Sequence, residues 1–234
     1  MYLSICSATV AGPRNIRDNK LNQDAVIQRF WGNYWCIAVC DGMGSKPFAE
    51  RGSTLACQSI YKVLKSCEDF DLCEKIIAKQ IYLYWLRLLK DKNIPPSDAA
   101  TTCLFAWGNK LGEVRLFQLG DGAIYYQTDH FGQVAVKNLD LFSNQTNALG
   151  YSKSWNDWSY KKVFLNQNHH GIGIMTDGVS DDLQNEQHFL SFLIKNAQLK
   201  NYRLMKKNIK NELLNWSTPQ HSDDKSIGLI CWKR

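Results

Sequence analysis

Three apolar runs in this chain each end in an Asp-Gly pair, and this repeated feature limits how the chain can fold. The pairs are Asp41-Gly42, Asp121-Gly122 and Asp177-Gly178. Two further acidic segments, Asp24 and Asp223-Asp224, lie just before apolar runs. Short apolar runs bounded by turn residues are typical of buried strands. We therefore expect the carboxylates from these segments to meet at one end of a sheet core.

An Asp-Gly pair is also the commonest two-residue turn of a β-hairpin, because Gly readily adopts the positive φ that a type I′ turn requires. Taken alone, Asp121-Gly122 fits a hairpin, since it joins the strand-like runs 114–119 and 123–128. Asp41 and Asp177 differ, because each follows a strand-like run and leads into a helical or irregular segment. A turn does not explain the acidic residue at those two positions.

Clustered carboxylates require positive charge nearby. Two carboxylates about 4 Å apart repel each other by about 4 kcal/mol at an effective dielectric constant of 20. Divalent cations remove this cost, and ligand sets made only of oxygen favour magnesium, manganese or calcium over zinc. The acidic segments therefore predict a centre for hard divalent cations.

Six short motifs follow one another along nearly the whole chain. They are Asn22-Gln23-Asp24-Ala25, Asp41-Gly42-Met43-Gly44-Ser45, Ala100-Thr101-Thr102-Cys103, Gly120-Asp121-Gly122, Thr176-Asp177-Gly178-Val179-Ser180-Asp181 and Asp223-Asp224-Lys225-Ser226. In order and spacing they resemble the motifs of the metal-dependent Ser/Thr protein phosphatases of the 2C type (PPM family), in their compact bacterial form. Each motif alone is weak, but the ordered set is specific.

The resemblance implies an α+β fold, a four-layer αββα sandwich with two central antiparallel sheets flanked by helix pairs. The apolar patterns agree with it: strands, helices over 48–66 and 72–90, strands, two helices within 191–216, and a final strand. This order lacks βαβ alternation and therefore favours a layered α+β arrangement over a doubly wound parallel sheet. We expect residues 1–234 to form a single 2C-type phosphatase domain.

The resemblance also implies roles for individual residues around two Mg²⁺ or Mn²⁺ ions. The implied ligands are Asp24, Asp41, the carbonyl group of Gly42, Asp177 and Asp223, with Asp121 and Asp181 for a third, weaker ion and with Gln23 and Thr102 supporting the acidic edge. Asp41 and Asp177 are the expected catalytic residues. Paired cations of this kind activate water for attack on phosphorus, so no covalent phosphoenzyme is required.

Three positions depart from the usual pattern of the family. Gln23 stands where many family members have Glu, which removes one negative charge near the second ion. Met43 replaces the His of the eukaryotic motif, so the general acid has no assigned residue. The family has an Arg that holds the substrate phosphate, since a guanidinium can donate two hydrogen bonds to phosphate oxygens. The spacing here is irregular: we favour Arg17 for this role, with Arg14 as the first alternative and a solvated loop without such a role as the second.

Composition excludes several other classes of protein. The net charge of +6 is modest, and the 28 basic residues are scattered along the sequence without forming a stripe. Binding to nucleic acid is therefore not favoured. No segment provides the roughly 20 apolar residues of a membrane span. The eight cysteines, without a C-x-x-C pair, favour free core thiols in a reducing, cytoplasmic compartment, with a disulfide framework as the weaker alternative.

Two histidine positions and one polar segment carry further expectations. We expect His169-His170 to be solvated loop residues, with metal binding as the weaker alternative. His221 is expected to be a loop residue, with a role as proton donor as its alternative. The segment 140–160 is the expected flap over the substrate.

The function expected from these observations is hydrolysis of phosphoserine and phosphothreonine in proteins, on a phosphoprotein substrate and with a Ser/Thr kinase as the partner that the family suggests. The alternative is a non-catalytic member of the same fold that binds a phosphoprotein or regulates a kinase. A metal-dependent nuclease is disfavoured because the basic residues are scattered.

Overall fold

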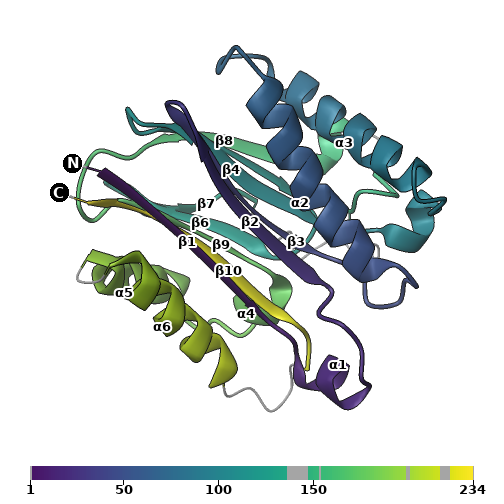
Figure 1. The fold of residues 1–234 in the computed structure, drawn as a ribbon. Helices are drawn as coiled ribbons and strands as arrows, with labels where there is room; N and C mark the ends of the chain where they lie inside the picture. The colour runs from purple at the N-terminus through teal and green to yellow at the C-terminus, as the bar shows by residue number, and fades with distance from the viewer. Residues whose placement is uncertain (1, 136–146, 153, 199–200, 217–221, 234) are drawn as a thin grey trace.

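The computed structural model describes residues 2–135, 147–152, 154–198, 201–216 and 222–233. Within them, two five-stranded antiparallel sheets stack face to face (Figure 1). One sheet has the order β1 (Tyr2–Val10), β10 (Lys225–Lys233), β9 (Gly171–Met175), β6 (Ala123–Gln127) and β7 (Phe131–Gln133). The other has the order β2 (Asp24–Trp31), β3 (Tyr34–Asp41), β4 (Cys103–Asn109), β5 (Glu113–Leu119) and β8 (Trp158–Phe164).

A pair of long helices covers the outer face of each sheet, which completes the predicted four layers (Figure 1). Helices α2 (Ala49–Ser66) and α3 (Glu74–Lys90) pack on the β2–β8 sheet, and α5 (Glu186–Gln198) and α6 (Tyr202–Leu214) on the β1–β7 sheet. The shorter helices are α1 (Pro13–Arg17), α4 (Asp177–Ser180), η1 (Pro96–Ala99) and η2 (Trp155–Asp157). The expected α+β sandwich and its helix pairs are confirmed.

The position of β3 explains why its sequence is continuously apolar and does not alternate between apolar and polar residues. Ile37 and Val39 point into the core between the two sheets, while Cys36, Ala38 and Cys40 point into the core under α2 and α3. Successive side chains of a strand lie on opposite faces, and here both faces are covered. The continuous run from Trp35 to Cys40 is therefore a central strand of a stacked sheet.

The hairpin interpretation of Asp121-Gly122 is wrong. The strands on either side of it, β5 and β6, belong to different sheets, so the dipeptide crosses from one layer of the sandwich to the other. Gly120 and Gly122 have φ of +101° and +83°, a backbone region that side chains rarely adopt. The Asp-Gly signal located a sharp change of direction, but it did not identify which strands would pair.

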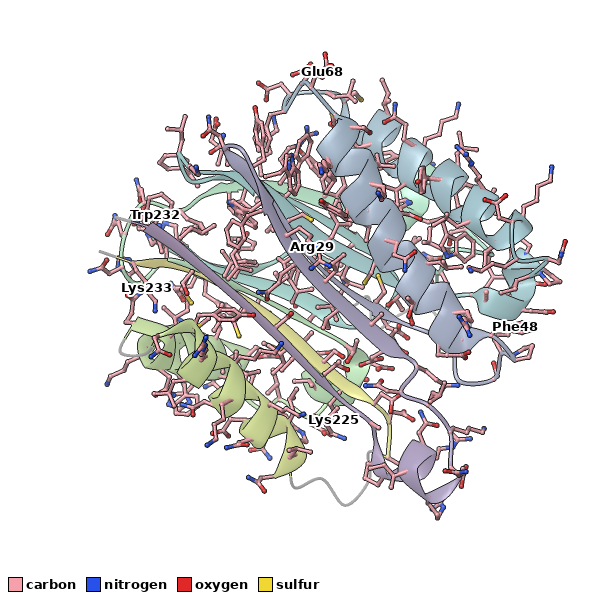
Figure 2. All side chains as sticks on the ribbon, viewed as in Figure 1. Arg29, Phe48, Glu68, Lys225, Trp232 and Lys233 are labelled. Carbon is pink, nitrogen blue, oxygen red and sulfur yellow. The ribbon has the colours of Figure 1, made fainter. Side chains whose placement is uncertain are left out.

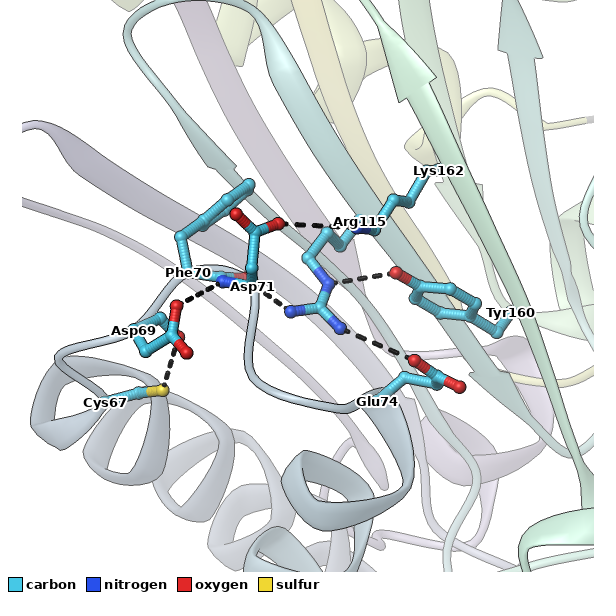
Figure 3. A network of polar contacts seen from close by, with 8 residues as sticks. All are labelled: Cys67, Asp69, Phe70, Asp71, Glu74, Arg115, Tyr160 and Lys162. Atoms are coloured by element: carbon cyan, nitrogen blue, oxygen red, sulfur yellow. Dashed lines mark hydrogen bonds and ion pairs between the residues drawn. The ribbon is translucent and has the colours of Figure 1, made fainter.

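A buried arginine fastens the loop between α2 and α3 to the sheet (Figure 3). Arg115 on β5 is 1% exposed, and its guanidinium donates hydrogen bonds to the Phe70 carbonyl group and, at 3.0 Å, to the Tyr160 hydroxyl. A carboxylate oxygen of Glu74 lies 3.9 Å from it. Rings including those of Trp107 and Phe70 surround the cation. Two hydrogen bonds, an ion pair and the surrounding rings together compensate the buried charge of Arg115.

All eight cysteines are free, as expected, and six of them are buried. Cys67 is half-buried and Cys73 is exposed, so these two are exceptions to the expectation of core thiols. In the described part of the chain, no helix combines the length and the apolar character that crossing a membrane requires.

Candidate metal centre

The acidic segments meet because neighbouring antiparallel strands run in opposite directions. Asp24 begins β2 and Asp41 ends β3, and the two are register partners. Asp177 follows the end of β9 and Asp223 precedes the start of β10, which pairs with β9. The stacked sheets therefore present these four residues at the same end of the sandwich.

A polar cavity of about 330 Å³ opens at this end. Its lining residues are Arg14, Asn15, Gln23, Asp41, Gly42, Met43, Gly44, Ser45, Thr102, Asp121, Asp177, Asp223 and Asp224. The residues predicted at this centre from the sequence are thus largely brought together. Three of the predicted residues, Asp24, Asp181 and Arg17, are outside the lining set.

Asp24 is paired in register with Asp41, does not line the cavity and is the most deeply buried of the predicted acidic ligands. One of its carboxylate oxygens accepts a hydrogen bond from the Thr176 hydroxyl at 3.0 Å. The other, Oδ1, is buried and has no hydrogen-bond partner among the described residues. Burial raises the pKa of Asp24 to about 7, although hydrogen bonds from Ser226 and Thr176 lower it in part. The unpartnered oxygen is available to a cation.

Asp41 is held by its backbone while its side chain faces other acids. Its N–H donates to the Thr102 hydroxyl at 2.9 Å, and its carbonyl group accepts from Thr102 N–H at 2.8 Å. Burial, together with the negative charges of Asp24 and Asp177, raises the pKa of Asp41 well above its usual range. Thr102 therefore supports the acidic edge by fixing the strand that carries Asp41.

Asp177 begins α4, where its carboxylate accepts a hydrogen bond from the Gly178 N–H at 2.7 Å. Burial raises the pKa of Asp177, and the charges of Asp181 and Asp223 raise it further, against hydrogen bonds that lower it. Asp181 thus acts on the centre through Asp177 although it does not line the cavity. Asp121 lines the cavity and contributes to the raised pKa of Asp41.

Asp223 and Asp224 are adjacent but have different surroundings. Lys225 donates to the backbone carbonyl group of Asp223 at 3.1 Å. The Asp224 carboxylate accepts hydrogen bonds from Gly12 N–H at 2.6 Å and from the Asn15 amide at 2.8 Å. It accepts a third from Gln23 N–H at 2.6 Å. Asp224 therefore ties the N-terminal loop to β10 and positions Gln23, a role that sequence reasoning missed. The Asp-Asp pair was the available signal, but its partners are about 200 residues away in the chain.

Gly42 occupies a position where a side chain does not fit. A Cβ atom at Gly42 would lie 2.2 Å from the Ala49 carbonyl oxygen and 2.9 Å from that of Gln23. Its N–H donates to the Gln23 carbonyl group at 3.1 Å. The backbone of Gly42 therefore lies close to both β2 and α2, beside Asp41.

The two candidate phosphate-binding arginines lie in different places. Arg14, on α1, lines the cavity. Arg17 is 74% exposed at its side chain, where its Nε lies 3.2 Å from Asp18 Oδ1. The structure therefore places Arg14, and not the favoured Arg17, on the wall of the acidic cavity.

The expected flap lies partly outside the described residues, since 140–146 and 153 are not described. The part that follows is anchored beside the centre, because Leu149 and Thr101 exchange backbone hydrogen bonds at 2.9 and 3.2 Å.

His221 also lies outside the described residues. The prediction that His170 is solvated is wrong: it is 2% exposed.

The residues present fit hard divalent cations. The candidate donors are carboxylate and carbonyl oxygens, which Mg²⁺ and Mn²⁺ prefer. Among the described residues, no ion pair joins Asp24, Asp41 or Asp177 to a basic side chain, Asp24 Oδ1 has no hydrogen-bond partner, and the pKa values of Asp41 and Asp177 are raised. Such clustering is common at functional sites.

The chain belongs to the protein phosphatase 2C family, whose model matches residues 11–214. No curated protein matches it significantly. Among solved structures, the serine/threonine phosphatase Stp1 from Staphylococcus aureus is similar with a TM-score of 0.70 and 14% identity, covering 100% of this chain and 96% of the other. PstP with two manganese ions gives 0.67 and 14%, covering 98% of both chains. RsbX with magnesium gives 0.65 and 12%, covering 98% and 95%. At these identities the likeness shows the fold.

Proposed function

We propose that this protein hydrolyses phosphoserine and phosphothreonine in protein substrates, with two Mg²⁺ or Mn²⁺ ions as cofactors. The observation that carries the proposal is the cavity that Asp41, Asp177 and Asp223 line together, with the buried Asp24 paired in register with Asp41. Membership of the protein phosphatase 2C family supports it. When bound, the cations supply neutralising charge and an acidified water for attack on phosphorus.

The chain's own residues hold and orient the reactants. Asp41, Asp177, Asp223 and Asp24, with the carbonyl group of Gly42, would hold the two ions, and Asp121 with Asp181 a weaker third. Thr102 keeps Asp41 in register through the hydrogen bond to its N–H. Asp224 positions Gln23 at the cavity wall. The general acid has no assigned residue, because Met43 lines the cavity where the eukaryotic motif has His.

Arg14 is the residue we propose for binding the substrate phosphate. It lines the same cavity as the carboxylates, whereas the Arg17 side chain is paired with Asp18. A planar guanidinium can donate two parallel hydrogen bonds to phosphate oxygens. The presence of Arg14 and the acidic residues in one cavity supports its role, because a bound phosphoester could then contact both the guanidinium and the cations.

The test is hydrolysis of p-nitrophenyl phosphate and of a phosphothreonine peptide in Mn²⁺ or Mg²⁺, compared with EDTA. Arg14→Ala and Arg17→Ala form a matched pair on one short helix. We expect Arg14→Ala to raise KM for the peptide at least about tenfold, a loss of about 1.4 kcal/mol, and Arg17→Ala to change it little. Equal effects of the two variants would refute the assignment of Arg14.

A non-catalytic member that binds a phosphoprotein, or regulates a kinase, is the second candidate. It is motivated by Gln23, a neutral residue in place of Glu, whose side-chain oxygen lies 3.4 Å from the Asn15 amide. Calorimetry with the same phosphopeptide separates the two. Tight binding without turnover in any metal would support the second function over the first. A Ser/Thr kinase remains a proposed partner, and the cytoplasm the proposed location.

A further inference from the structure

A second group of metal-binding side chains lies far from the acidic cavity. Asp129, in the turn between β6 and β7, and His169 and His170, just before β9, each place one ligand atom within 4.8 Å of the others. We refer to these three residues as the histidine cluster. His170 precedes β9 and Asp177 follows it, and a five-residue strand is about 17 Å long.

The contacts of strand β10 confirm that the histidine cluster lies far from the acidic cavity. The His170 carbonyl group accepts a hydrogen bond from Trp232 N–H at 3.1 Å, near the end of β10. Lys225, which contacts Asp223, begins the same strand. Figure 2 labels Trp232 and Lys225, which lie at opposite ends of β10. The histidine cluster and the acidic centre therefore occupy opposite ends of the β1–β7 sheet.

His170 has a buried nitrogen atom whose hydrogen-bonding capacity is not used. The residue is 2% exposed, and its Nε2 has no hydrogen-bond partner among the described residues. Asp129 Oδ1 lies 3.4 Å away, within ion-pair range but without hydrogen-bond geometry. A buried polar atom without a partner costs free energy, so its presence here requires an explanation.

The 3.4 Å separation suits a shared metal ion. Zinc lies about 2.0 to 2.1 Å from nitrogen and oxygen ligands in tetrahedral sites, which puts two such ligands about 3.3 Å apart. The His169 and His170 rings are perpendicular, at 89° with centroids 4.6 Å apart. The two rings are therefore not stacked, and each of the three residues places one ligand atom within 4.8 Å of the others.

The turn that carries the two histidines is well anchored. His170 N–H donates to the Gln167 carbonyl group at 2.9 Å, and the Gln198 side chain donates to the backbone carbonyl groups of Asn168 and Trp232. Gln167 also donates to Asp129 Oδ1 at 3.2 Å, which links the turn to the acidic member of the cluster. Ligands held in this way lose little freedom when they bind an ion.

The second ring nitrogen of His170, Nδ1, accepts a hydrogen bond from the Asn166 N–H at 3.3 Å. In the neutral ring the proton is therefore on Nε2, which faces Asp129 Oδ1. An ion bound at Nε2 replaces this proton, which moves to Nδ1 at the cost of the Asn166 contact and finds an acceptor in the Phe164 backbone.

We propose that Asp129, His169 and His170 bind one divalent transition-metal ion of the zinc class. Imidazole donors select this class, whereas the oxygen donors of the acidic cavity select Mg²⁺ or Mn²⁺. The ion joins the β6–β7 turn to the start of β9, and three protein ligands leave one coordination position for water. The site is independent of the proposed phosphatase reaction.

The test uses the full chain in an excess of Mg²⁺, which occupies the oxygen-donor centre. Zn²⁺ is titrated against a chromophoric chelator, and Co²⁺ is followed by its visible absorption. We expect one Zn²⁺ per chain, with affinity at least about tenfold weaker in His169→Ala and in Asp129→Asn. Both residues are exposed, so these changes leave the core intact. His170→Asn alters a buried position, and its folding must first be checked by circular dichroism.

Two control variants test where the Zn²⁺ binds. His188→Ala removes an exposed histidine at the start of α5 and should bind Zn²⁺ as the wild type does. Asp41→Asn disables the acidic centre and should also retain the Zn²⁺ site. Zn²⁺ should raise the melting temperature of the wild type but not of the His169→Ala/Asp129→Asn double variant. Absence of Zn²⁺ binding in excess Mg²⁺, or equal affinity in the wild type and the double variant, would overturn the proposal.

Discussion

Two clusters of charged groups share the β2–β8 sheet and balance their charge in opposite ways. Arg115 on β5 is a single buried cation, and a carbonyl group, a hydroxyl group, a carboxylate and aromatic rings surround it (Figure 3). Asp24 and Asp41, at the start of β2 and the end of β3, are neighbouring acids, and Asp177 adds a third. The charge of Arg115 is compensated by groups of the chain itself, whereas the described residues around the three acids raise their pKa values instead of pairing with them.

The difference shows how to recognise a site from electrostatics. A buried charge whose partners come from the same chain holds elements together, as Arg115 holds the loop between α2 and α3. Like charges buried side by side oppose folding unless a ligand neutralises them, and their pKa values rise in consequence. The acidic centre carries this electrostatic repulsion at one end of the sandwich. A bound cation should therefore have its largest effect on stability through this centre.

The largest effect should come from Asp41→Asn. This change leaves the backbone contacts of Asp41 with Thr102 in place and removes the charge at the middle of the cluster. We expect phosphatase activity to fall at least about a thousandfold, or about 4 kcal/mol in barrier. Stability of the metal-free protein should rise, because repulsion is removed. Steady-state kinetics in Mn²⁺ and thermal unfolding in EDTA measure the two effects. A variant with wild-type activity would exclude Asp41 from the reaction.

Arg115→Met should show the opposite pattern. It removes the cation and leaves the Phe70 carbonyl group without its partner, so we expect a loss of about 3 kcal/mol in free energy of unfolding. This value is at the low end for a broken buried pair because Glu74 is 30% exposed and can turn to water. Urea denaturation measures the loss, while kcat in Mn²⁺ should stay near the wild-type value well below the melting temperature. A fall in kcat with unchanged stability would contradict the division of roles.

The pH dependence of stability should reveal the acidic centre directly. The pKa of Asp24 is raised from 3.8 to about 7 in the folded protein, so the unfolded chain loses its proton first as pH rises. The stability that the protonated form provides is present below about pH 4 and is lost as pH rises toward 7. In EDTA, the melting temperature should therefore be higher at pH 5 than at pH 8.

Saturating Mn²⁺ should reverse this order. An ion at a hundred times its Kd adds about 2.7 kcal/mol, and it binds best when the carboxylates are ionised, at pH 8. Differential scanning calorimetry at the two pH values, with and without Mn²⁺, measures both effects. In Asp41→Asn the EDTA difference should shrink. A melting temperature that Mn²⁺ leaves unchanged at pH 8 would count against a cation site.

The smallest effect should come from Tyr160→Phe, which removes the hydroxyl group that accepts from Arg115 at 3.0 Å and keeps the ring. The expected loss is about 1 kcal/mol in free energy of unfolding, the usual value for one hydrogen bond. Activity should not change. Chemical denaturation of this variant and of Arg115→Met compares how much free energy of unfolding is lost when one hydrogen bond is removed and when the whole cation is removed. Equal losses would place most of the stabilisation in the Tyr160 hydrogen bond.

The sequence by itself determined the order of strands and helices and the positions where acidic residues end or precede strands. The run from Trp35 to Cys40 is apolar because both faces of β3 are covered, and the helix pairs are amphipathic because each covers one sheet. These are local consequences of burial, so they are visible in periodicity. The six ordered motifs added the family and hence the sandwich.

Only the tertiary structure decided which strands pair and which polar residues are buried. Asp121-Gly122 joins two sheets instead of closing a hairpin, because its flanking strands find partners elsewhere in the chain. Arg115 and His170 are buried by segments distant in sequence, and Arg14 faces the cavity where Arg17 does not. A side chain's surroundings are set by contacts between remote elements, and neither composition nor spacing along the chain records those contacts.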